Sequence, residues 1–176
     1  MAATPVGVDP LELEHVIGWT GKFPGTLLTH PKEDGTFFCA LGSAVCVGDI
    51  YDPHKQRFLR GHDATVSSLA VSSSGRLVAS GQLRSTLVAT GDASVMVWDH
   101  VKGGAVYTFF GLTEGIHHLQ FSPDERFLAA AAADNTLSVW DMSTGEQVSC
   151  PALLARSRPR FCSAHHRPST LLHPLK

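Results

Sequence analysis

Two groups of residues carry side chains that nucleophilic catalysis uses. The run Ser72-Ser73-Ser74-Gly75 supplies hydroxyls near His62, and His62 with Asp92 would form two thirds of a catalytic triad. A serine nucleophile needs a base beside it and an oriented third group, and the sequence has no Gly-x-Ser-x-Gly turn to present one. We therefore predict that the serine run is a hairpin turn, that His62 and Asp92 are buried structural residues, and that the chain has no catalytic residue and is not an enzyme.

Two further segments resemble ligand sites only superficially. The string from Gly18 to Phe23 hints at a phosphate-binding loop, but its spacing is wrong and no Ser or Thr follows Lys22 to hold magnesium. The Cys-x-x-His-His spacing near the end of the chain fits no familiar zinc site, and adjacent histidines on an extended chain point apart. The residues of zinc-binding type there are Cys162, His165, His166 and His173. We predict no metal and no cofactor.

Composition limits the class of protein. The length of 176 residues predicts one domain, and 43% hydrophobic with 17% charged residues is typical of a folded chain. The formal charge of −2 argues against a general nucleic-acid binder, which needs a basic surface. Residues 151–176 hold five of the 14 basic side chains and none of the 16 acidic ones, so the rest of the chain has a charge of −7. This basic tail is predicted to be irregular and solvated, with contact to acidic surfaces as the alternative.

The sequence favours a reducing location inside the cell. The four cysteines, at 39, 46, 150 and 162, form no Cys-x-x-Cys pair, and we expect free thiols. Residues 1–10 lack the features of a secretory signal and are predicted to be a flexible N-terminus. The longest apolar run, Phe127–Ala133, is far shorter than the ~20 residues that cross a bilayer, so no membrane contact is expected.

These candidate residues lie within a repeated unit. Gly61 aligns with Gly111 at an offset of 50, and Trp98-Asp99 aligns with Trp140-Asp141 at an offset of 42, so the first copy has eight extra residues within 82–91. A weaker copy precedes them, with Gly48 where tryptophan would stand. Each unit is read as four short strands. In the middle unit the strands are expected at Thr65–Val71, Arg76–Gly81, Ser94–Asp99 and Ala105–Phe109.

A period of about 40–45 residues with Gly-His near its start and Trp-Asp at its end is the WD-repeat signature of a β-propeller blade. The spacing predicts a buried network in which Asp92 accepts a hydrogen bond from His62, His62 bonds Ser80, and Ser80 bonds the indole of Trp98. The next unit keeps Asp134 and Trp140 but has Leu112 and Ala130 in place of His and Ser, so apolar packing must replace its network. The predicted structural network is His62, Ser80, Asp92, Trp98, Asp134 and Trp140.

Certain strings are more specific. Residues 11–21 (LELEHVIGWTG), 66–72 (VSSLAVS) and 77–82 (LVASGQ) resemble the cilia- and flagella-associated WD-repeat proteins of the axoneme, over about residues 11–149. The echinoderm-microtubule-associated-protein-like family shares much of this pattern, but the Pro24-Gly25 to His30-Pro31 stretch favours the ciliary family. The resemblance implies a microtubule inner protein, a scaffold on the lumenal wall of doublet microtubules that contacts tubulin and neighbouring axonemal proteins.

The chain departs from the family's closed propellers because it contains about three blades, which we place near 24–60, 61–110 and 111–149. The expected fold is thus all-β, an incomplete WD40-type propeller over 11–149, followed by an irregular basic tail over 150–176 that reads like a truncated ending. Open blade edges predict self-association.

Two functions follow. The first is a non-enzymatic scaffold of the cilium or flagellum axoneme, with unidentified partner-binding residues. The alternative is a general cytosolic WD-repeat adaptor, or a truncated product without function.

Overall fold

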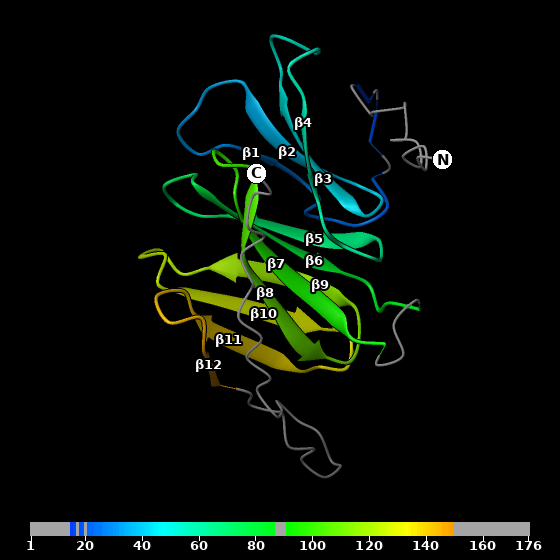
Figure 1. Cartoon of the computed structure of the whole chain (residues 1–176), viewed down its shortest axis with the longest axis vertical. Helices are drawn as coiled ribbons and strands as arrows, with labels where there is room; N and C mark the ends of the chain where they lie inside the picture. Colours follow the sequence, from blue (N-terminus) through cyan, green and yellow to red (C-terminus); the bar gives the residue numbers. More distant parts are fainter. Residues whose placement is uncertain (1–14, 17, 20, 87–90, 150–176) are drawn as a thin grey trace, which may run out of the picture.

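Three four-stranded antiparallel sheets make up the described chain. The computed structural model describes residues 15–149 except 17, 20 and 87–90. We call the sheets blade 1, blade 2 and blade 3 in chain order, and they follow one another along the long axis of the molecule (Figure 1). Each sheet places its strands in sequence order, as the repeat predicts for a propeller blade. In the described part of the chain, no helix is long and apolar enough to cross a membrane.

The strand bounds follow the repeat. Blade 1 consists of β1 (Leu27–Thr29), β2 (Thr36–Leu41), β3 (Ala44–Asp49) and β4 (Arg57–Arg60). Blade 2 consists of β5 (Val66–Val71), β6 (Leu77–Gln82), β7 (Ala93–Asp99) and β8 (Gly104–Leu112). Blade 3 consists of β9 (Ile116–Phe121), β10 (Phe127–Ala132), β11 (Leu137–Asp141) and β12 (Gln147–Ser149). In blade 2, seven of the eight predicted strand ends lie within one residue of those observed, while β8 runs three residues further than predicted. The predicted termini, 1–10 and 150–176, lie outside the described residues.

Equivalent turns connect the first and second strands of blade 2 and of blade 3. Gly75 ends the turn between β5 and β6 with φ of 86°, and Glu125 occupies the same repeat position between β9 and β10 with φ of 60°. Glycine adopts this left-handed conformation without steric cost, whereas glutamate does so with some strain. The Glu125 side chain accepts hydrogen bonds from the backbone N–H and the hydroxyl of Ser74, which join the two turns.

The core lies between the sheets. One face of blade 1 packs against blade 2 through a cluster that includes Phe38, Val45, Leu69 and Trp98. The opposite face of blade 2 packs against blade 3 through a second cluster, which includes Val95, Val97, Leu128 and Trp140. Blade 2 is thus covered on both faces, and its β7 is buried along its whole length. We call these two interfaces between neighbouring blades seams. They hold the buried side chains of the repeat, including Trp98 and Trp140, in place.

Candidate functional site

The network at the centre of blade 2 joins strands β6 and β7 to the segment that precedes β5. The hydroxyl Oγ of Ser80 lies 2.7 Å from Nε2 of His62, and the indole N–H of Trp98 donates to the same oxygen at 2.7 Å. All three side chains are buried. Because Trp98 supplies a proton to Ser80 Oγ, the serine O–H is free to donate to His62 Nε2. This arrangement requires the neutral histidine tautomer with its proton on Nδ1.

The other side of His62 faces Gln82. Nδ1 of His62 lies 2.7 Å from Oε1 of Gln82, whose amide donates to a carboxylate oxygen of Asp63 at 2.6 Å. The hydroxyl of Ser85 donates to the second carboxylate oxygen of Asp63 at 2.7 Å. Burial is the main cause that lowers the pKa of His62. The network therefore runs from Trp98 to Asp63 with a neutral imidazole at its centre.

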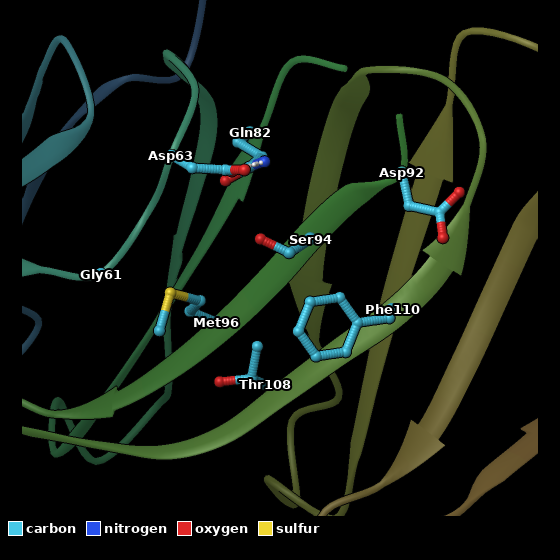
Figure 2. A pocket seen from close by; sticks show the side chains of 8 residues that line it. All are labelled: Gly61, Asp63, Gln82, Asp92, Ser94, Met96, Thr108 and Phe110. Carbon is cyan, nitrogen blue, oxygen red and sulfur yellow. Dashed lines mark hydrogen bonds between the residues drawn. The ribbon is translucent and has the colours of Figure 1, made fainter. Parts of the chain in front are cut away.

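The prediction that Asp92 bonds His62 is wrong. Gln82 holds Nδ1 of His62, and Figure 2 shows Asp92 at the start of β7, apart from the Gln82–Asp63 pair. The physical reason is the extension between β6 and β7, which separates Asp92 from the end of β6 by nine residues. A sequence signal for Gln82 existed, because it lies two residues after Ser80 on one strand and so points to the same face. Asp63 carries no such signal, because the repeat predicts its aspartate in the turn before the third strand, at Asp92, and not next to His62.

In blade 3 the equivalent aspartate does lie in the tight turn. Although burial raises the pKa of Asp134, bonds from Thr136 and Thr113 outweigh it and lower the pKa below its usual value. The Thr113 hydroxyl donates at 2.8 Å, and the Thr136 hydroxyl donates at 2.6 Å. Trp140 is buried and stacks on the ring of Phe109 from blade 2, with ring centroids 4.6 Å apart. Stacking across the seam thus takes the place of the His–Ser chemistry.

In blade 1, Gly48 stands where the repeat has tryptophan, and the ring of Phe37 fills the space that the indole would take. A Cβ on Gly48 would lie 2.4 Å from Cζ of Phe37, so the phenyl ring already occupies the space above the glycine. Phe37 and Gly48 are directly opposite in the β2–β3 register. One pair further along this face, Cys39 and Cys46 face each other as buried free thiols. The aromatic ring covers the glycine across the strands and keeps the face apolar.

The aspartate of each Trp-Asp pair forms an ion pair with the arginine that precedes the second strand. Nε of Arg76 donates to Asp99 at 3.1 Å, and Nε of Arg126 donates to Asp141 at 3.2 Å. Both arginines are 61% exposed. Hydrogen bonds from Ser143 are the main cause that lowers the pKa of Asp141. Each ion pair joins the start of the second strand to the end of the third strand, at the same place in blades 2 and 3.

The serine run is structural. Ser72 accepts the turn hydrogen bond from Gly75 N–H at 2.9 Å, and Ser73 donates to the carbonyl of Pro123 in blade 3 at 3.2 Å. His62 precedes β5 and Ser72 follows it, so the six-residue strand separates the two by about 20 Å. The structure therefore does not bring the hydroxyl run and the histidine together as a nucleophile and base.

One His/Glu cluster lies in the seam between blades 1 and 2. Ligand atoms of His30, Glu33 and His100 lie within 4.8 Å of one another. Nδ1 of His30 accepts the backbone N–H of Glu33 at 2.6 Å, and its Nε2 faces Gly75, where an added Cβ would lie 2.0 Å away. Nδ1 of His30 is therefore engaged with the backbone, which leaves its Nε2, on the side that faces Gly75, as the nitrogen that could bind a metal ion. The zinc-type residues Cys162, His165, His166 and His173 lie outside the described residues.

The comparisons with known proteins fit this geometry. The family model "WD domain, G-beta repeat" matches residues 53–99 and 103–141. The crystal structure of RRP9 WD40 repeats superposes with a TM-score of 0.61 and 23% identity, over 70% of this chain and 37% of that one. The chain contains WD40 repeats. Its three sheets are WD40 blades, and the sequence-based prediction of an all-β, incomplete propeller is confirmed.

Relatives of this chain include ciliary proteins. Cilia- and flagella-associated protein 52 of Chlamydomonas reinhardtii is 38% identical over 80% of this chain, and the human protein of that name is 33% identical over 80%. WD repeat-containing protein 90 of Mus musculus is 29% identical over 85%. The WD40 chain spans 22% of the length of the first two relatives and 8% of the third. The resemblance to the ciliary WD-repeat family, stated from the sequence, is confirmed.

Proposed function

We propose that the chain is a non-enzymatic interaction scaffold of the cilium or flagellum. The observation that carries this proposal is the 38% identity to a cilia- and flagella-associated protein over 80% of this chain. WD40 blades act by presenting rigid loops and strand edges to other proteins. The finer part of the proposal is that the chain binds the lumenal wall of axonemal doublet microtubules, with tubulin and neighbouring axonemal proteins as partners.

A scaffold without chemistry of its own agrees with the roles of the polar residues. His62 bonds the hydroxyl of Ser80, and the same oxygen accepts a hydrogen bond from the indole N–H of Trp98, so this serine serves the structure of the blade. The serine run and Glu125 bind each other across the seam between blades. These groups are committed to holding the sheets together, which supports binding through surface area in place of catalysis.

A general cytosolic WD-repeat adaptor is the second candidate. It is favoured by the similarity to WD repeat-containing protein 90, whose name specifies no organelle. Self-association through the open sheet of blade 3 stays a prediction for either function. Sedimentation velocity at several concentrations of the chain tests it directly, because self-association makes the sedimentation coefficient rise with concentration.

Retention in axonemes separates the two candidates. The tagged 176-residue chain is expressed in ciliated cells, and detergent-extracted axonemes are washed with salt. The ciliary proposal expects the tag in the washed axoneme, and it expects loss of the tag with Trp98→Ala, which empties the buried centre of blade 2. The exposed Glu146→Gln variant is the matched control and should be retained. A parent chain that stays in the cytosol would contradict the ciliary function and favour the adaptor.

A further inference from the structure

A small groove opens on blade 2 beside the network. Its volume is about 260 Å³, and its lining includes side chains from β6, β7 and β8. Figure 2 shows Asp63 and Gln82 at one end and Asp92 with Phe110 at the other. Pockets for small molecules usually measure about 300–1,000 Å³, so this groove is better matched to a single side chain than to a cofactor.

The charge of the groove is negative. Hydrogen bonds from Ser85 and Gln82 are the main causes that lower the pKa of Asp63, which keeps it a carboxylate at neutral pH. Within the described part of the chain, the Asp92 carboxylate has no hydrogen-bond or ion-pair partner. Arg84 packs over Gly91 beside the groove, but its guanidinium pairs with Glu114 at 3.5 Å. The groove therefore favours a cation.

An aromatic ring lies next to the unpaired carboxylate. Phe110 on β8 is 64% exposed, and in Figure 2 its ring lies between Asp92 and Thr108. The face of an aromatic ring attracts Lys and Arg, and their aliphatic stems cover apolar surface while the charged group reaches a carboxylate. Ser94 adds a buried hydroxyl, whose Oγ lies 3.5 Å from Nδ1 of His62, longer than an ordinary hydrogen bond.

The strand that carries Phe110 has a free edge. β8 has nine residues and pairs only with β7 among the described strands. Val106, four residues before Phe110 on the same strand, is also exposed. An open edge of this length offers backbone groups to an extended segment of another chain. Such a segment would lie beside Phe110 and within reach of Asp92.

We propose that this groove binds a lysine or arginine side chain from an extended segment of a partner protein, with the cation between Asp92 and the ring of Phe110. The inference rests on the proposed scaffold function in taking a protein segment as the ligand. It adds where that segment binds and which side chain it must carry.

A display library of random dodecapeptides, selected on the full chain, tests the proposal. The selected peptides are expected to contain Lys or Arg next to an apolar residue, and their Kd is measured by fluorescence anisotropy. Asp92→Asn and Phe110→Ser should each weaken binding about tenfold or more, because each removes one half of the cation site. Asp92→Glu keeps the charge and should bind like the parent.

Two variants outside the groove serve as controls. Glu146→Gln removes an exposed carboxylate from blade 3, and Val148→Ser removes a side chain that is 60% exposed, close to the 64% of Phe110. Both should leave the Kd unchanged, and thermal unfolding should show that all variants fold. The proposal is overturned if no peptide is selected, if the peptides lack a basic residue, or if groove and control variants bind alike. Peptide binding is measured without cilia, so a chain that binds these peptides but washes out of axonemes contradicts only the ciliary function.

Discussion

Blades 2 and 3 place small apolar side chains at the same repeat positions, but only blade 2 buries them. Ala79, Val95 and Val97 of blade 2 are fully buried under blade 3. Their equivalents in blade 3, Ala129, Leu137 and Val139, are only partly buried, and no sheet covers them among the described residues. The difference shows that a WD40 sheet is patterned for two covered faces, whatever its neighbours are.

The two blades also differ in how they fix their strands. Blade 2 uses a chain of directional hydrogen bonds through His62, whereas the equivalent positions of the next repeat are apolar, with Leu112 at the end of β8 and Ala130 on β10. Hydrogen-bond networks specify register but are costly when one member is lost, and apolar packing tolerates change more evenly. We therefore expect blade 2 to be more sensitive than blade 3 to the loss of a single side chain of this set.

A buried charge should separate the two blades most strongly. Val97→Asp places a carboxylate in the closed seam and should lower the free energy of unfolding by about 4 kcal/mol or more, which is enough to unfold a marginal domain. Val139→Asp, at the same repeat position, can keep its charge in contact with water and should cost about 1 kcal/mol. Urea unfolding measures both variants. Equal losses would show that the outer face of blade 3 is closed too.

Removal of a network hydroxyl should have a smaller effect. Ser80→Ala strands the Trp98 indole N–H and Nε2 of His62, and should lower the free energy of unfolding by about 2 kcal/mol or more. Ala130→Ser makes the reverse change in blade 3, where Leu112 offers no polar partner, so it should destabilise the blade and not strengthen it. Thermal unfolding of the two variants compares them. A stabilised Ala130→Ser would contradict the apolar reading of blade 3.

Acidification gives the mildest test. Burial lowers the pKa of His62 in the folded chain from its ordinary value of 6.5, so the unfolded chain binds more protons below that pH. Stability is therefore complete above pH 6.5 and falls as the pH drops, by at most about 1.4 kcal/mol per unit for one group. His100, whose pKa is lowered mainly by burial, adds to this loss. Urea unfolding between pH 7 and 5 measures how the free energy of unfolding depends on pH. This dependence should be weaker for His62→Gln than for the parent chain, and an unchanged dependence would show that His62 does not contribute to it.

Much of this structure could be predicted from the sequence, because the repeat constrains it. The alignment of Trp98 with Trp140 and the alternation within each unit place the strands of blades 2 and 3, and the spacing of His62, Ser80 and Trp98 places them together. Local patterns carry this information because strand side chains alternate with a period of two.

What could not be predicted depends on contacts between segments that the repeat does not relate. The extra residues before Asp92 leave its position undetermined, and Gln82 takes its place. The ring of Phe37 over Gly48 requires the strand register of a blade whose signature is weak. The bond between Ser74 and Glu125 crosses a seam whose geometry no single unit specifies.

Native-state hydrogen exchange tests the central claim, that blade 2 is closed on both faces and blade 3 on one. Backbone amides of β6 and β7 should exchange at least about tenfold more slowly than those at the equivalent positions of β10 and β11, because blade 3 can open without uncovering blade 2's far seam. Mass spectrometry of peptides from the two blades measures both sets in one sample. Equal protection would contradict the account, since it would mean that the two blades open as one unit or that the outer face of blade 3 is covered.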